Sequence, residues 1–147
     1  MSAVGVDVGG TFVKAVRLGS GREVVARTRR PTPEAPSEII DVVEEVAAEL
    51  GPGLPLGLGL AGLVDHDAGQ LVWAPHLPGT SVDFRTPLAE RLGVPVVVDN
   101  DANLGAVAEY RGGHLARTMD LVYLTGEVAI GAGVLMNGEP LRGASGF

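Results

Sequence analysis

Residues 5–16 read GVDVGGTFVKAV, with an aspartate between two valines and then two glycines and a threonine. Apolar residues alternate with other residues on both sides of the glycines, which is the two-residue period of β-strands. The glycines predict a tight turn between two antiparallel strands. This turn is either a plain hairpin or a backbone cradle for a phosphate group. On this stretch alone the plain hairpin is the better interpretation.

The composition predicts one α/β domain, at most with part of a second. The chain has 147 residues, and most domains contain about 100 to 200 residues. Hydrophobic residues make up 46% but aromatic residues only 4%, so the core must consist of valine, leucine and alanine. That composition is typical of a sheet covered by helices.

Charge and residue content exclude several classes of function. The net charge is -7, which argues against binding to nucleic acid or to an anionic membrane through clustered Lys and Arg. The chain has no cysteine, so disulfides and thiolate chemistry are excluded. Neither a signal peptide nor an apolar run of about 20 residues is found. We therefore expect a cytoplasmic protein that does not contact a membrane.

The first part of the chain predicts an antiparallel meander followed by a helix. The predicted strands are residues 4–8, 12–18 and 23–29. Three prolines in residues 30–37 end the sheet, because proline cannot donate to a ladder. Ser37 is the predicted N-cap of an amphipathic helix over residues 38–50, which Gly51 and Pro52 close.

The remainder alternates strands and helices. Glycines at positions 57 and 59 leave one face of the next strand without side chains, so that another element can come close. The further predicted elements are a short strand at Val72 and Trp73, a helix from Thr86 to Leu92 with Pro87 at its first position, a buried strand over residues 94–101 and a helix over residues 102–110. A new meander begins at residue 119, with Asn137 and Gly138 as its hairpin turn.

Four segments follow one another along the chain: DVGGT at 7–11, GLAGLVD at 59–65, VVVDNDAN at 96–103 and GAGVLMNGEPLRGASG at 131–146. Together and in this order, they resemble the ROK family of bacterial sugar kinases and sugar-responsive transcriptional repressors. The match covers nearly the whole chain. It implies an α/β, ribonuclease H-like fold of the actin and hexokinase type, with a mixed five-stranded sheet flanked by helices in residues 1–118. Residues 119–147 would be the opening hairpin of a truncated second domain.

With this resemblance, the phosphate interpretation of the first turn becomes the favoured one. Gly9 and Gly10 can adopt positive φ and turn backbone N–H groups toward an anion, and Thr11 adds a hydroxyl group. Asp7 would then lie beside a phosphate-bound Mg²⁺, as a direct or water-mediated ligand. The resemblance implies ATP and Mg²⁺ as cofactors of the kinase branch.

The second glycine-rich segment argues against ATP. By resemblance, Gly131 and Gly133 belong to a second phosphate loop that reads GTGIGxG in the family's kinases. Residues 127–133 read EVAIGAG instead. Glu127 would repel the β and γ phosphates by about 1 kcal/mol in high dielectric and by several kcal/mol when desolvated. This segment resembles the repressor branch, whose nucleotide loop is commonly degraded while its sugar site persists.

Asn100 and Asp101 stand at the carboxyl end of a predicted buried strand, where α/β sheets bind their ligands. By resemblance, Asn100 hydrogen-bonds sugar hydroxyls, Asp101 is the catalytic base that accepts the proton of the attacking hydroxyl, and Gly62 lines the sugar site through its backbone. The alternatives are that Asn100 and Asp101 cap the next helix, which is compatible with a sugar role, and that Gly62 is a simple strand-end glycine. We expect Asp7 and Asp101 to face a common hollow. Asp99 is interpreted as a cap or surface acid without a functional role.

The other polar residues are interpreted as structural or solvated. Glu109 is expected in a salt bridge, and the histidines, which lack a metal-ligand spacing, are expected in solvent; they are His66, His76 and His114. The family's zinc motif and its sugar-binding Glu-x-x-His would lie beyond Phe147. The chain is therefore expected to be a fragment without a zinc site and inactive as a kinase by itself.

The sequence is compatible with three functions. The first is the sugar-sensing domain of a transcriptional regulator, and the second is the N-terminal domain of an ATP-dependent, glucokinase-like sugar kinase. The third is an actin-like binding module with neither activity. The expected partner is a small-molecule sugar, with DNA contacted only through a domain not present here. Because the tail from residue 119 would expose apolar residues, we also expect a homo-oligomer; these residues are Leu121, Tyr123, Val134 and Leu135.

Overall fold

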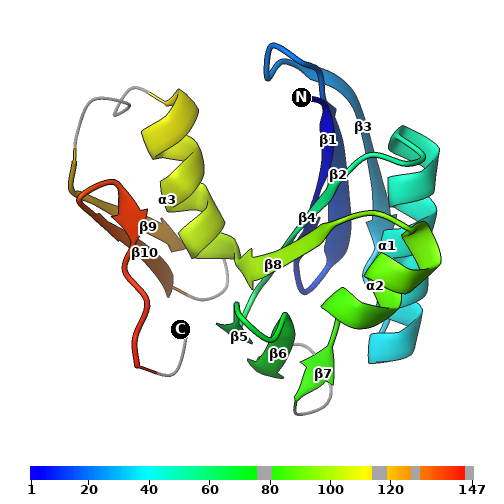
Figure 1. Ribbon diagram of the computed structural model, residues 1–147. Helices are drawn as coiled ribbons and strands as arrows, with labels where there is room; N and C mark the ends of the chain where they lie inside the picture. The colour runs from blue at the N-terminus through cyan, green and yellow to red at the C-terminus, as the bar shows by residue number, and fades with distance from the viewer. Residues whose placement is uncertain (76–80, 114–118, 127–129, 145–147) are drawn as a thin grey trace.

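The computed structural model describes residues 1–75, 81–113, 119–126 and 130–144. Within these ranges the chain forms one five-stranded sheet, two three-stranded sheets and three helices (Figure 1). In this described part, no helix is long and apolar enough to cross a membrane.

The large sheet has the strand order β3-β2-β1-β4-β8. Its strands are β1 (Ala3–Val8), β2 (Phe12–Leu18), β3 (Val24–Pro31), β4 (Leu56–Leu60) and β8 (Val96–Asn100). The first three form the predicted antiparallel meander, whereas β1, β4 and β8 run parallel to one another. The sheet is therefore mixed, and the predicted α/β class is confirmed.

Two helices, α1 (Pro36–Leu50) and α2 (Arg85–Leu92), cover one face of this sheet (Figure 1). Every second residue of the parallel strands is buried against them, as are Ile39, Val43 and Val46 of α1. The strand residues are Val4, Val6, Val8, Leu56, Leu58, Leu60, Val96 and Val98. Each such side chain contributes about 1.5–3 kcal/mol by leaving water. The core thus consists of Val, Leu and Ile with few aromatic residues, as the composition predicts.

Both of these helices begin earlier than predicted. Ala35 is the N-cap residue of α1 and Pro36 follows in its first turn, so Ser37 lies inside the helix and is not the cap. Proline fits there because the first N–H groups of a helix have no partner within the helix. In α2 the first residue is Arg85, and Pro87 comes third rather than first.

A small sheet connects β4 to α2 and has the order β5-β6-β7. It consists of β5 (Leu63–Asp65), β6 (Gln70–Trp73) and β7 (Val82–Asp83). The turn between β5 and β6 is closed by a hydrogen bond from the backbone N–H of Ala68 to Asp65 Oδ1 at 2.9 Å. The Arg85 guanidinium donates to the carbonyl oxygens of His66 and Asp67 in the same turn. These bonds hold the backbone of the turn that carries His66.

The third helix, α3 (Asp101–Gly112), starts directly after β8 and lies on the other side of the large sheet (Figure 1). It packs against a sheet made of β9 (Leu121–Gly126), β10 (Ile130–Met136) and β11 (Glu139–Pro140). Asn137 and Gly138 connect β10 to β11 with φ values of 54° and 80°. A two-residue turn with both φ values positive is typical of type I′ hairpins, so the predicted hairpin is confirmed.

The exposure of this hairpin sheet differs from the prediction. Leu121 and Leu135 are buried with Ala106 of α3, and Tyr123 packs against the same cluster. The fourth predicted residue, Val134, pairs with Val122 on the outer face and is half-buried. That face carries the most exposed apolar side chains: Val122 is 63% exposed, Leu124 70%, Ile130 88% and Met136 50%. The reason is the strand period of two, which directs neighbouring residues to opposite faces. The boundary between residues 118 and 119 as a domain limit stays a prediction.

Candidate functional site

The carboxyl ends of β1, β4 and β8 meet at one edge of the large sheet. Asp7 pairs with Gly59 of β4, and Gly59 pairs with Asp99 of β8. The three residues therefore form one row with their side chains directed to the same face. Asp101 follows two residues after Asp99, and a Cβ atom at Gly59 would lie 3.7 Å from the Cα atom of Asp101. Asp7 and Asp101 thus lie at the same sheet edge, while a common hollow between them stays a prediction.

The turn between β1 and β2 is tied to the segment after β3. The backbone N–H of Gly9 donates to the carbonyl oxygen of Phe12 at 3.1 Å, which closes the turn. Thr32 Oγ1 donates to the carbonyl oxygen of Gly9 at 2.7 Å, and the Thr32 N–H donates to that of Thr11 at 3.0 Å. The turn is therefore a hairpin. Because the Gly9 N–H is used within the turn, a phosphate would have to bind the N–H groups of Gly10 and Thr11.

Neither Gly9 nor Gly10 uses the conformational freedom of glycine. Positive φ occurs among the described glycines at positions 53, 62, 69, 93 and 138 only. The positive φ that these glycines allow is therefore not used, and three residues join the two strands without a left-handed one. Gly10 and Thr11 are exposed. Their assignment to a phosphate site, together with Gly9, stays a prediction.

Asp7 is the predicted magnesium ligand, and it lies at the end of β1 opposite Lys14 of β2. Its carboxylate lies 3.6 Å from Lys14 Nζ, and the two side chains are 49% and 55% exposed. Such an exposed pair contributes about 0–1 kcal/mol. Among the described residues, no group of three or more acidic, His or Cys side chains could hold a metal by itself. Magnesium usually takes one or two carboxylates and completes its shell with phosphate oxygens and water. Asp7 is compatible with that pattern, and its role as a metal ligand stays a prediction.

Asn100 is the N-cap residue of α3. Its Oδ1 atom accepts hydrogen bonds from the backbone N–H groups of Ala102 at 2.9 Å and Asn103 at 3.1 Å. Its Nδ2 atom donates to the carbonyl oxygen of Gly62 at 2.9 Å. The capping alternative is therefore correct for Asn100, and the same side chain connects two residues predicted to contact a sugar. Asp101 follows as the first residue of α3, half-buried.

Two glycines in β4 and the residues after it allow close approach of other elements. A Cβ atom at Gly62 would overlap the carbonyl oxygen of Trp73 in β6. A Cβ atom at Gly59 would lie 3.2 Å from Leu104 Cδ1 in α3. The bare strand face predicted from the sequence is thus approached by α3 at Gly59, whereas nothing lies within 4 Å of a Cβ atom at Gly57.

The model of the ROK family matches residues 3–147. The chain belongs to the ROK family. Among curated relatives, it is 26% identical over 167 residues to the xylose repressor of Caldicellulosiruptor bescii and 28% identical over 146 residues to the glucokinase of Streptomyces coelicolor. These matches cover 99% and 97% of the chain. Among solved structures, it is similar to a ROK family glucokinase from Streptomyces griseus in complex with glucose and AMPPNP. That match has a TM-score of 0.90 and 29% identity over 99% of the chain.

The chain spans less than half the length of these ROK relatives: 39% of the repressor, 46% of the Streptomyces coelicolor glucokinase and 48% of the solved glucokinase. The structural match confirms the ribonuclease H-like fold of the actin and hexokinase type, with the mixed sheet flanked by helices. Both repressors and kinases occur among the relatives, so the family is established without separating its two branches.

In this ROK chain, Gly131 and Gly133 lie against α3. A Cβ atom at Gly131 would lie 3.1 Å from the Cβ atom of Ala102, and one at Gly133 would overlap the carbonyl group of Ala102. The close packing of β10 on the helix therefore requires glycine at position 133. The nucleotide role of both glycines stays a prediction, and Glu127, with which we argued against ATP, lies outside the described residues.

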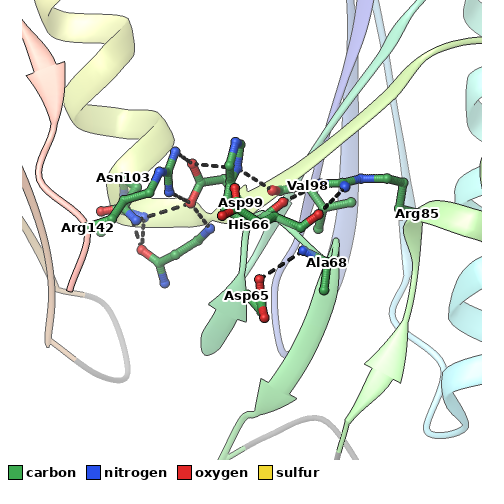
Figure 2. A network of polar contacts seen from close by, with 11 residues as sticks. Asp65, His66, Ala68, Arg85, Val98, Asp99, Asn103 and Arg142 are labelled. Carbon is green, nitrogen blue, oxygen red and sulfur yellow. Dashed lines mark hydrogen bonds and ion pairs between the residues drawn. The ribbon is translucent and has the colours of Figure 1, made fainter. Parts of the chain in front are cut away.

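Asp99 is the residue that the sequence analysis missed. It is 2% exposed, and among the described residues it is the only buried charged side chain. Arg142, from the segment after β11, donates to both carboxylate oxygens at 3.0 and 2.7 Å (Figure 2). Burial raises the pKa of the Asp99 carboxyl, but the hydrogen bonds from Arg142, Asn103 and the Asn100 backbone hold the pKa below its usual value. The interpretation as a cap or surface acid is therefore wrong, because Asp99 is buried and Asn100 is the N-cap residue of α3.

His66 is also less exposed than predicted. Its side chain is 28% exposed, and Nδ1 lies 2.9 Å from the carbonyl oxygen of Val98 and 3.5 Å from Asp99 Oδ2 (Figure 2). Because a carbonyl oxygen only accepts, Nδ1 is the nitrogen that carries a proton in this contact. The expectation that His66 is solvated is therefore wrong. His76 and His114 lie outside the described residues.

Proposed function

We propose that this chain is the sugar-recognition domain of a ROK-family transcriptional regulator. The observation that carries the proposal is the hydrogen bond from the Asn100 amide to the carbonyl oxygen of Gly62. It holds together two of the three residues expected to contact a sugar, and the third, Asp101, is the next residue in the chain. The three residues offer amide, carbonyl and carboxylate groups, which are suitable donors and acceptors for sugar hydroxyls.

The regulator is favoured over the kinase by residues 127–133. The sequence EVAIGAG replaces three residues of the GTGIGxG loop, and the charge of Glu127 opposes phosphate binding. The close packing of Gly133 on Ala102 supports the same conclusion, because it accounts for that glycine without a nucleotide. In a regulator, sugar binding at Asn100 and Asp101 would be read out by a DNA-binding domain elsewhere in the protein.

An ATP-dependent sugar kinase is the second candidate. It is favoured by Asp7 and Asp101, which lie at the same edge of the sheet. In that role Asp101 would accept the proton of the attacking sugar hydroxyl. Asp7 would hold Mg²⁺ directly or through water, with Gly9, Gly10 and Thr11 near the phosphates. ATP would supply the phosphoryl group. The named glucokinases among the relatives support this candidate.

Sugar recognition can be tested with the single tryptophan of the chain. Trp73 is the only tryptophan, and its backbone packs against Gly62, so its fluorescence should respond to a sugar bound there. We expect a saturable change with at least one of glucose, xylose and N-acetylglucosamine. Asp101→Asn should weaken it at least tenfold, because a carboxylate accepts stronger hydrogen bonds than an amide.

The matched control is Asp41→Asn. Asp41 is an exposed acid of α1 that pairs with Arg91 of α2, and both helices lie on the face of the sheet opposite to α3 (Figure 1). It should leave the affinity unchanged. Absence of saturation with all three sugars, checked by calorimetry, would reject sugar recognition. An equal effect of both substitutions would reject the assignment of Asp101 to the site.

The two candidates are separated by ADP release with the same sugars, measured on the full-length protein, because this chain is expected to be inactive as a kinase by itself under either candidate. We expect no turnover by the full-length protein and no binding of a non-hydrolysable ATP analogue. The triple variant Glu127→Gly, Val128→Thr, Ala129→Gly of the full-length protein has the kinase sequence in the loop and should bind the analogue more tightly. Turnover by the unaltered full-length protein would instead support the kinase.

A further inference from the structure

The Asp99 carboxylate connects the end of β8 to three other parts of the fold (Figure 2). Its Oδ1 atom accepts from the backbone N–H of Asn100 at 2.8 Å and from Asn103 Nδ2 at 3.1 Å, in addition to Arg142 Nη1. His66 approaches Oδ2 from the turn between β5 and β6. One buried oxygen therefore binds the peptide group of the residue that caps α3 and a side chain of its first turn.

Arg142 connects Asp99 to the hairpin sheet, because it follows β11 of that sheet. Its guanidinium meets Asp99 with two roughly parallel hydrogen bonds, a geometry that fixes orientation as well as distance. The arginine side chain is 24% exposed, and the Asp99 side chain is 3% exposed. The position of the Asn100 peptide group thus depends on the placement of a segment that is 43 residues away in sequence.

We propose that Asp99 and Arg142 are positioning residues for Asn100 and Asp101. Arg142 holds the Asp99 carboxylate, and the carboxylate holds the Asn100 N–H and Asn103, so that the Asn100 amide points to Gly62 and Asp101 stands at the start of α3. An apolar pair of equal size could fill the same space, but it could not bind the N–H of Asn100. This inference rests on the proposed sugar site.

The proposal is tested with Arg142→Gln, Arg142→Lys and Asp99→Asn in the full 147-residue chain. Folding is first checked by circular dichroism, and affinity is measured for the sugar that gives the strongest Trp73 response. We expect Arg142→Gln and Asp99→Asn to lower the affinity at least tenfold at a temperature where each variant is folded. Arg142→Lys should recover only part of the loss, because lysine keeps the charge but not the two-bond geometry.

The matched control is Arg91→Gln, on an arginine that pairs with Asp41 and Glu44 on the far side of the sheet. It should leave the affinity within twofold of the unaltered chain. A folded Arg142→Gln variant with affinity within twofold of the unaltered chain would overturn the proposal. The effects of Arg142→Gln and Asp99→Asn should also be less than additive in the double variant, because both remove one interaction.

A second measurement decides the proposal if no sugar binds. Amide hydrogen exchange of Asn100, Ala102 and Asn103 reports on the bonds that these N–H groups make to the side chains of Asp99, Asn100 and, for Ala102, also Asp101. We expect exchange to accelerate at least tenfold at these positions in Arg142→Gln, with no such change in Arg91→Gln. Unchanged exchange would overturn the positioning role, whereas faster exchange without sugar binding would support the positioning role and reject the proposed function alone.

Discussion

Gly133 of β10 lies directly against the backbone of Ala102 in the first turn of α3. A Cβ atom at position 133 would overlap the carbonyl group of Ala102 and lie 2.9 Å from the Cβ atom of Ala106. Strand and helix come this close because glycine in the strand faces alanine in the helix. The contact joins the hairpin sheet to the helix that begins with Asp101.

Gly133→Ala should therefore destabilise the protein. The added methyl group meets backbone, which cannot move aside as a flexible side chain does, and overpacking of this kind costs about 1–3 kcal/mol. Chemical denaturation monitored by circular dichroism measures the loss. The control is Gly57→Ala, at a strand position where nothing lies within 4 Å of the new atom. A loss for Gly57→Ala as large as that for Gly133→Ala would contradict the packing argument.

Asn100 offers a way to separate helix capping from sugar binding. Asn100→Asp keeps a good N-cap oxygen but puts an acceptor in place of the Nδ2 donor, facing the carbonyl oxygen of Gly62, so we expect the cap to persist while the Gly62 contact and the sugar affinity are lost. Asn100→Ala should lose both, with about 0.5–2 kcal/mol of stability from the missing cap. Thermal unfolding and Trp73 fluorescence give the two values for each variant. Undiminished sugar binding by Asn100→Asp would show that the amide serves the helix only.

Asp99 should make the stability dependent on acid pH. Its folded-state pKa is lowered, so its contribution is present above the unfolded-state pKa of about 3.9 and is lost as the pH falls through the folded-state value. Asp99→Asn should cost about 2–3 kcal/mol at pH 7, somewhat below the range for a fully buried pair, because Arg142 is partly exposed. Calorimetry at about 0.1 M salt should show that, as the pH is lowered from 5, the free energy of unfolding falls less in the variant than in the unaltered chain. Parallel pH curves would contradict the buried ion pair.

The outer face of the hairpin sheet should promote self-association. Leu124 and Ile130 are 70% and 88% exposed on that face, and a contiguous exposed apolar face is unfavourable in water. Sedimentation velocity should show a mass that rises with concentration, and the double variant Leu124→Lys, Ile130→Lys should remain monomeric. The control Val25→Lys adds charge at another exposed apolar position, on the edge strand β3, and should leave association unchanged. A monomer at all concentrations for the unaltered chain would contradict this expectation.

The sequence is sufficient to predict those elements whose signals lie in neighbouring residues. The alternation of Val4, Val6 and Val8 and the prolines after residue 30 specify the meander and its end, because both signals act on neighbouring backbone groups. The Asn137–Gly138 turn was predicted for the same reason. The start of α1 was misplaced because Ser37 and Pro36 both favour a helix start, and the position of Pro36 prevailed.

The sequence is insufficient to predict which residues are buried where a contact joins segments that are distant in the chain. Three consecutive polar residues, Asp99 to Asp101, do not reveal which acid is buried, because the answer depends on an arginine 43 positions later. The residues predicted to be exposed belong to both faces of the hairpin sheet, because only the packing on α3 distinguishes the two faces. One usable signal was available: glycines at 131 and 133 and alanines at 102 and 106 are the small residues that a close strand and helix require.

The packing of β10 on α3 has a consequence for how the domain could respond to a ligand. Because glycine in β10 packs directly on alanine in α3, a rotation of the hairpin sheet would press its backbone against the helix. Asp101 is the first residue of that helix, so any such rotation would change the angle at which its carboxylate meets a hydroxyl group. Movement far from the large sheet would in this way be transmitted to the residues at its edge.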